Sequence, residues 1–229
     1  MKKLLFLLLT TPIILLGQFG NGDGITTDAQ VGIVMEEVPI EGTPFMNPTY
    51  KLGETIVNGK SKTQALMRYN AYYDYIELLD ENNTPRKLLR RKSIQAFFEG
   101  KTYKILDYAE AGKIREAYFN PFNKGEIKLL FRPKKIFIQA EKPDNGYDTY
   151  DPPIYKDISS YYILMGEAPA TKTRLGKRQL LKHLTKNTAQ VKKFISNEKL
   201  NLKKEADVIE LIDYYNSLLP RSLDSGAQS

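Results

Sequence analysis

The feature that most constrains the fold is a series of short β-rich runs between residues 44 and 170, each ended by turn residues. Asn58-Gly59, the strongest short hairpin signal, separates the first two runs, and Glu99-Gly100 and Ala111-Gly112 separate later ones. Parallel neighbours need a crossover of about a dozen residues or more, and these spacers are too short to provide one. The spacing therefore predicts an antiparallel meander, either closed as a barrel, packed as a sandwich or left as an open sheet.

The expected strands follow from β-branched and aromatic residues bounded by turns. They cover residues 55–57, 66–78, 87–94, 96–98, 102–108, 114–119, 127–131, 135–140 and 158–165. One further strand-like run, 31–35, lies in the Gly-rich acidic stretch 18–43, which we expect to be a flexible arm. The Pro- and Gly-containing stretch 142–157 is predicted to be an exposed irregular loop.

The apolar spacing becomes helical after Thr171. A buried stripe at the i, i+3, i+4, i+7, i+11 spacing is formed by Val208, Leu211, Ile212, Tyr215 and Leu219. An earlier helix is indicated by Leu175, Leu180, Leu181 and Leu184. Asn187 with Gln190 resembles a capping pair before a second helix, and Asn201 precedes the third. The chain is thus predicted to be α+β, an antiparallel sheet followed by a C-terminal bundle of about three short helices.

The first seventeen residues have the three parts of a secretory signal peptide. A cationic start precedes an apolar run over 4–16, and a small residue, Gly17, ends it. That run is shorter than the roughly 20 residues a spanning helix needs, so we expect the leader to be removed after export. The expected organisation is a signal peptide over 1–17, an arm over 18–43, a β module over 44–170, a basic helical module over 171–221 and a disordered tail over 222–229.

Composition narrows the chemistry. The chain has no Cys and a single His, His183, which rules out thiolate catalysis and the common Cys- or His-rich metal sites as wholly internal features. It also lacks the Cys that a lipoprotein acyl anchor requires. His183 lies in a lysine-rich helical stretch and is expected to be a helix-flank residue. No phosphate-binding Gly loop or nucleophile elbow is present, so the sequence favours a non-enzymatic protein without a cofactor.

Positive charge is concentrated in residues 171–204, which contain eleven basic residues and one acidic residue, Glu198. Lysines near an anionic membrane each contribute about 1 kcal/mol to binding, although lysines also populate ordinary solvated helix faces. The candidate anionic-surface contacts are Lys172, Arg174, Lys177, Arg178, Lys182, Lys186, Lys192 and Lys193. Because export separates the protein from genomic DNA, nucleic acid is not an expected partner.

Tyrosine is abundant, with 15 residues and no Trp. Tyr69, Tyr72, Tyr73 and Tyr75 fall in one run and are expected to pack on a half-buried sheet. A second group, in the predicted loop, could stack on and hydrogen-bond a sugar. This candidate ligand loop consists of Asp144, Asn145, Tyr147, Asp148, Tyr150, Asp151 and Tyr155. Its oxygen ligands do not follow the calcium-loop pattern, because Tyr155 stands where the bidentate Glu belongs.

Several segments together resemble the uncharacterised exported envelope proteins of the Bacteroidota. They are the Lys-Lys leader ending in Leu-Leu-Gly, Gly42-Thr43-Pro44-Phe45-Met46-Asn47, Arg68-Tyr69-Asn70-Ala71-Tyr72-Tyr73-Asp74 and Leu211-Ile212-Asp213-Tyr214-Tyr215-Asn216. The resemblance implies an envelope location, an antiparallel β module and a C-terminal helical tail. It carries no catalytic signature.

Two functional hypotheses follow. The first is an exported, non-enzymatic envelope protein that binds a protein partner or an anionic membrane surface. The second is a secreted carbohydrate-binding or carboxylate-based glycan-processing module centred on the predicted loop. The expected location is the periplasm or the periplasmic face of the outer membrane, with release into the medium less favoured.

Overall fold

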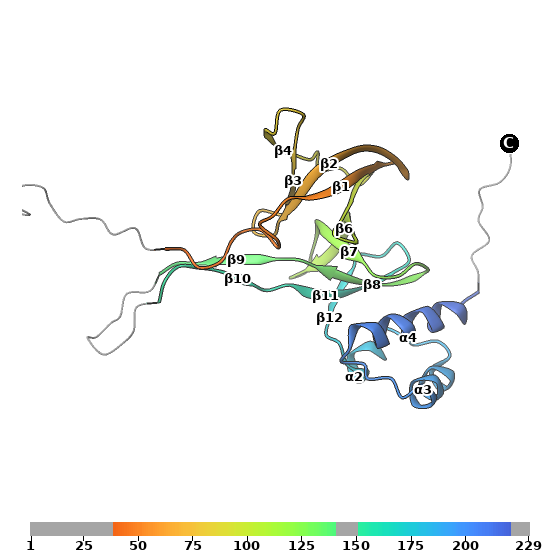
Figure 1. Ribbon diagram of the computed structural model, residues 1–229. Coiled ribbons are helices and arrows are strands. Elements are labelled where there is room, and N and C mark those ends of the chain that lie inside the picture. The colour runs from red at the N-terminus through yellow and green to blue at the C-terminus, as the bar shows by residue number, and fades with distance from the viewer. Residues whose placement is uncertain (1–38, 141–150, 221–229) are drawn as a thin grey trace, which may run out of the picture. The chain divides into compact units, whose positions relative to one another are not determined.

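A computed structural model describes residues 39–140 and 151–220 of the 229-residue chain (Figure 1). Its strands are β1 (Lys51–Val57), β2 (Lys60–Asn70), β3 (Tyr75–Leu79), β4 (Pro85–Lys87), β5 (Ile94–Phe98), β6 (Lys101–Glu110), β7 (Lys113–Pro121), β8 (Ile127–Arg132), β9 (Lys135–Ile138), β10 (Ile154–Asp157), β11 (Ser160–Met165) and β12 (Thr171–Thr173). Its helices are α2 (Lys177–Leu180), α3 (Thr188–Asn197) and α4 (Glu205–Ser217).

Ten strands form one curled sheet in the order β12-β11-β8-β7-β6-β5-β1-β2-β3-β4, and β9 pairs with β10 in a separate two-stranded sheet. All of these strand pairs are antiparallel. The predicted α+β class, an antiparallel sheet followed by short helices, is confirmed. The hairpin at Asn58-Gly59 is confirmed as well: both residues have positive φ, 50° and 75°, as a two-residue turn with matching twist requires.

Three differences between the observed strands and the sequence prediction change the path of the chain. The run 66–78 is divided by a turn at 71–74, after which the chain reverses from β2 into β3. The run 87–94 is not one strand, because the chain leaves the sheet after β4 and returns at Ile94. The end of the predicted irregular loop, Ile154–Asp157, is strand β10. The expected strand at 31–35 lies outside the described residues.

The hairpin of β6 and β7 contributes buried side chains to two different cores. Tyr103 and Ile105 of β6 and Tyr118 of β7 belong to one core cluster, which they share with residues of β2, β3 and β5. Ala117 and Phe119 of β7 belong to another. The four residues from Ala117 to Asn120 are therefore buried without interruption, as expected for a strand covered on both sides.

The second of these cores lies inside a ring of five strands. Ala170, just before β12, accepts a hydrogen bond from Ala109 N–H at 3.0 Å and donates one to the Asp107 carbonyl at 2.8 Å. This parallel bridge brings the end of the sheet back to β6, so β6, β7, β8, β11 and β12 surround a common interior. Its buried residues are Tyr108, Ala117, Phe119, Leu130, Tyr162 and Ala170.

A third core joins the helices to the outer face of β8 and β11 (Figure 1). Four residues of the predicted α4 stripe, Val208, Leu211, Ile212 and Tyr215, are at most 2% exposed, and Leu219 packs against them. On the sheet side the contacts come from Ile127 and Leu129 of β8 and Ile163 of β11.

The helix starts differ in detail from the prediction. Thr171–Thr173 still pairs with β11, so helix begins at Lys177 and α2 has only four residues. Asn187 does precede α3, but it has φ 52° and makes no side-chain capping bond. The predicted capping pair is therefore wrong. Asn201 precedes α4 as predicted, and the helix begins at Glu205.

Candidate functional site: a tyrosine surface

Five aromatic rings form a continuous chain, which we call the tyrosine surface: Phe137, Tyr155, Tyr72, Tyr73 and Tyr75. Successive ring centroids are 5.0, 5.4, 4.6 and 6.3 Å apart in that order. The side chains of Tyr72 and Tyr73 are 38% and 67% exposed, and the other three are half-buried. Adjoining aromatic side chains that reach solvent form an apolar patch, and we therefore take the tyrosine surface as the candidate site.

The tyrosine surface combines two parts of the chain that are distant in sequence. Tyr72 and Tyr73 lie in the turn between β2 and β3, whereas Phe137 and Tyr155 lie in the sheet of β9 and β10. Backbone hydrogen bonds connect the two: Lys135 N–H donates to the Ala71 carbonyl at 3.0 Å. The two groups of rings therefore keep a defined relative position.

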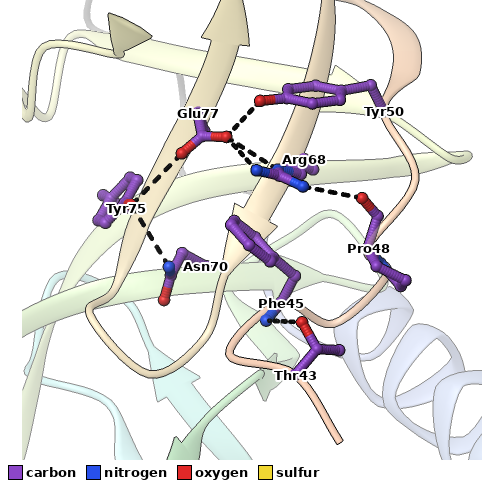
Figure 2. A network of polar contacts seen from close by, with 8 residues as sticks. All are labelled: Thr43, Phe45, Pro48, Tyr50, Arg68, Asn70, Tyr75 and Glu77. Carbon is purple, nitrogen blue, oxygen red and sulfur yellow. Dashed lines mark hydrogen bonds and ion pairs between the residues drawn. The ribbon is translucent and has the colours of Figure 1, made fainter. Parts of the chain in front are cut away.

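Asn70 holds the turn from the inside. Its side chain is buried, with 2% exposure, and its Oδ1 accepts a hydrogen bond from Tyr73 N–H at 2.9 Å. Its Nδ2 donates to the Tyr75 hydroxyl at 3.3 Å (Figure 2). One buried amide thus positions the backbone of Tyr73 and the ring of Tyr75.

Asp74 ties the same turn to β7. Its carboxylate accepts hydrogen bonds from the Tyr69 hydroxyl at 2.5 Å and from Tyr118 N–H at 3.2 Å, and it forms an ion pair with Arg90 at 2.9 Å. Burial, followed by the charge of Asp74, raises the pKa of Tyr69 well above its usual value, so this hydroxyl stays protonated and donates. These contacts of the Asp74 carboxylate hold the turn against β7 and Arg90.

A second polar network continues from Tyr75 to Glu77 (Figure 2). The guanidinium of Arg68 lies over the rings of Phe45 and Tyr50, 3.6 and 4.3 Å from their centroids, and pairs with Glu77 at 2.5 Å. The Tyr50 hydroxyl also bonds Glu77. Burial opposes ionisation of Glu77, but its hydrogen bonds with Tyr50 and Arg68 outweigh this and lower its pKa.

The predicted ligand loop is only partly described. Asp144, Asn145, Tyr147, Asp148 and Tyr150 lie outside the described residues, and Asp151 is exposed. Tyr155 is part of the tyrosine surface. The expectation that the run from Tyr69 to Tyr75 packs on the sheet holds for Tyr69, which is buried, and is wrong for Tyr72 and Tyr73, which the turn directs outward.

Sequence reasoning missed Phe137 and the convergence of the two tyrosine groups. Phe137 falls in a predicted strand with no feature that sets it apart. A signal for Tyr72 and Tyr73 was available in Asp74, because Asp tolerates the left-handed conformation, φ 56°, that this turn requires. Two large residues before such an Asp are more consistent with a turn than with a strand interior.

The eight predicted cationic contacts are all exposed. Within residues 39–140 and 151–220, none of them forms an ion pair. His183 is half-buried, and burial followed by the nearby charge of Lys182 lowers its pKa.

The described residues contain neither a metal-binding cluster nor a helix that could cross a membrane. In the part of the chain that the structure describes, no cluster of three or more His, Asp or Glu side chains is placed to hold a metal ion. None of the described helices has the length and apolar character needed to cross a membrane.

Comparison with protein-family models, with curated proteins and with solved structures found no match for this chain.

Proposed function

We propose that this protein is a non-catalytic binding module that recognises a glycan through the tyrosine surface. The observation that carries the proposal is the continuous chain of five rings, two of which are exposed. The apolar faces of a sugar pack on aromatic rings, while the phenol hydroxyls of tyrosine hydrogen-bond its hydroxyl groups.

Preorganisation supports the same proposal. Asn70 and Asp74 hold the turn through four hydrogen bonds and one ion pair. A ligand that binds rings already held in place loses little of its binding free energy to ordering the protein. The rings are tilted or perpendicular to one another except for Tyr73 and Tyr75, so they fit an irregular ligand better than a flat crystalline one.

The test is a glycan array followed by titration of any hit against variants. We expect Tyr73→Ala to weaken binding by about tenfold or more, equivalent to about 1.4 kcal/mol. Phe97→Ala is the matched control, because Phe97 is also an exposed aromatic residue, 41%, but lies in β5 outside the tyrosine surface. It should bind like the unchanged protein.

Two outcomes count against a glycan ligand. The array could show no binding, or Tyr73→Ala could bind as well as the unchanged protein. If the array is blank while an envelope protein is retained in pull-downs by the unchanged protein and lost with Tyr73→Ala, the tyrosine surface is instead a protein-docking site.

We also propose that the protein acts after export, in the cell envelope. The support is the cationic start, apolar run and small residue of the first seventeen residues. Cell fractionation and the mass of the mature N-terminus test this. Full-length protein recovered from the cytosol is the contrary result.

A second candidate function is attachment to an anionic surface through the helical module. It is favoured by the eight exposed cations, which form no ion pair among the described residues. Sedimentation with phosphatidylglycerol vesicles should be reversed by salt and weakened by the Lys177→Gln, Arg178→Gln, Lys182→Gln variant. Three exposed lysines of the sheet, Lys51, Lys60 and Lys113, changed to Gln, provide the control with the same loss of charge.

A further inference from the structure

A groove of about 420 Å³ lies where the ring of five strands meets β5 and the chain that follows β7. It is lined by Gln95, Thr102, Lys104, Leu106, Pro121, Phe122, Asn123, Lys124, Lys128 and Leu164. A smaller hollow of about 230 Å³ adjoins it and shares Lys104, Leu106, Lys128 and Leu164. The groove is within the size range of small-molecule sites.

The floor of the groove is apolar and built on the core. Leu106 of β6 and Leu164 of β11 pack against the buried core inside the ring while also lining the groove. Pro121 and Phe122 add further half-buried apolar surface. This floor therefore rests on regular strands and not on a loop.

The rim of the groove is positively charged. Lys104, Lys124 and Lys128 line it, and its lining contains no Asp or Glu. Among the described residues none of these lysines forms an ion pair. Two acidic residues line the adjoining hollow: Asp107, which is paired with Lys92 at 2.7 Å, and Glu167, which is exposed.

The amide of Asn123 in the groove lining is already hydrogen-bonded within the protein. Asn123 Nδ2 donates to the Ile127 carbonyl at 3.0 Å, and its Oδ1 accepts from Leu129 N–H at 2.8 Å. It shapes the groove and is not free to bind. The three lysines are thus the groups that can satisfy an incoming charge.

We propose that this groove is a second binding site, distinct from the tyrosine surface, for a monomeric amphipathic anion. The ligand carries a carboxylate or phosphate group on an apolar body. Its anionic group pairs with Lys104 and Lys128, and its apolar body lies on Leu106, Leu164 and Phe122. Charge complementarity selects this class, since a neutral ligand leaves the ammonium groups without a partner and a cation is repelled.

Calorimetric titration with sodium decanoate and with decyl phosphate, both below their micelle concentrations, tests the proposal. Decanol, decyltrimethylammonium, acetate and inorganic phosphate separate the apolar from the charged contribution. We expect the two amphipathic anions to bind and the other four compounds to bind at least about tenfold more weakly, because loss of either contribution removes on the order of one charged hydrogen bond or a buried apolar chain.

Variants locate the site. Lys104→Gln with Lys128→Gln should weaken decanoate binding by about tenfold or more, whereas Lys104→Arg with Lys128→Arg should retain it. The matched control is Lys101→Gln with Lys113→Gln, which removes the same charge from exposed positions of β6 and β7 that do not line the groove. Thermal unfolding of each variant shows whether it is folded.

The proposal is overturned by any of four results. These are failure of both amphipathic anions to bind, equal binding of decanol, equal binding by the folded Lys104→Gln, Lys128→Gln variant, or binding only of anionic vesicles and not of the monomers. Glycan binding at the tyrosine surface should be unaffected by the lysine variants, so the two proposals fail separately.

Discussion

At the scale of single residues, the packing of Arg68 depends on the planar shape of its side chain. The guanidinium stacks between Phe45 and Tyr50 and pairs with Glu77, whose side chain is only 12% exposed. Arg68→Lys keeps the charge but loses the stacking and the forked hydrogen bonds. We expect it to lower the free energy of unfolding by about 1–2 kcal/mol, measured by urea denaturation.

Arg86 provides the comparison for Arg68. It also pairs with a carboxylate, that of Asp80 at 3.0 Å, but its side chain is 65% exposed. Arg86→Lys should change stability by less than about 0.5 kcal/mol, since exposed ion pairs contribute little. Equal effects of the two substitutions would show that the aromatic rings contribute nothing.

The lowered pKa of His183 predicts that the folded protein loses stability in mild acid. Its pKa is lowered in the folded protein, from 6.5, by burial and then by Lys182. As the pH falls below about 6.5 the unfolded chain takes up a proton more readily than the folded protein, so stability decreases toward lower pH. This contribution is absent above that pH, where both states are neutral.

The measurement for His183 is urea denaturation between about pH 7 and 5.5, where no other side chain of this sequence ordinarily titrates. The loss of stability on acidification should be smaller in His183→Asn than in the unchanged protein. Identical slopes for the two proteins contradict the expectation.

At the scale of elements, α4 is attached to β8 by more than apolar packing. Asn216 accepts a hydrogen bond from Ile127 N–H at 2.9 Å and donates one to the Ile127 carbonyl at 2.8 Å. Its amide thereby takes the place of a neighbouring strand at the first residue of β8. Gly125 makes room for it, because a Cβ there would lie 2.7 Å from Asn216 Nδ2.

Removing this amide should loosen the helix from the sheet. Asn216→Ala leaves the Ile127 N–H without its partner and removes one of the two side-chain hydrogen bonds to the Ile127 carbonyl, which keeps the one from Asn123. We therefore expect a loss of about 2 kcal/mol in thermal or urea unfolding. Glu210→Ala, also in α4 but exposed, is the control and should change stability by less than about 0.5 kcal/mol. A similar small effect for Asn216→Ala would mean that apolar packing alone holds α4.

At the scale of the whole molecule, tyrosines that belong to different cores share a raised pKa. Burial raises the pKa of Tyr118 to about 12; the charge of Arg90 opposes this shift and the charge of Asp74 adds to it. Tyr161 bonds Glu205 of α4 at 2.9 Å and joins the sheet to the helices, and burial and then this bond raise its pKa to about 12.

These shifts predict alkaline unfolding. The folded pKa of each tyrosine exceeds its unfolded value of 10, so the stabilisation is complete below about pH 10 and is lost as the pH rises toward 12. Ultraviolet absorbance of tyrosinate and circular dichroism, recorded together, should show some tyrosines ionising only with loss of the fold. Ionisation of all the tyrosines with one midpoint near pH 10, while the fold is retained, is the result that contradicts this.

The sequence predicted the local elements of the sheet and the last helix well. Asn58-Gly59 identifies its hairpin because few residue pairs adopt two positive φ angles, and the α4 stripe is identified by its period. The burial of the central hairpin of β6 and β7 was harder to predict from the sequence. Ala117 to Asn120 does not alternate, since both faces of β7 are buried, and nothing in that run shows which side chain meets which core.

The candidate site was predicted only in part, for a related reason. Tyr155 was assigned to a ligand loop and Tyr72 to a sheet face, and their contact depends on the pairing of Lys135 with the turn at Ala71. No sequence pattern identified the groove lysines Lys104 and Lys128 as part of a binding site. Each is an ordinary solvent-compatible residue in its strand, and they become one feature only through the pairing of the strands.

The sequence by itself determined the antiparallel hairpins and the buried stripe of α4, because residue periodicity and left-handed turn positions are local properties that neighbouring residues impose. Only the tertiary structure decided that the sheet returns to β6 at Ala170, that two distant tyrosine groups share one surface and that three lysines surround one groove. These features depend on contacts between residues far apart in the chain, and the free energy of such contacts is set by packing and burial that no local pattern contains.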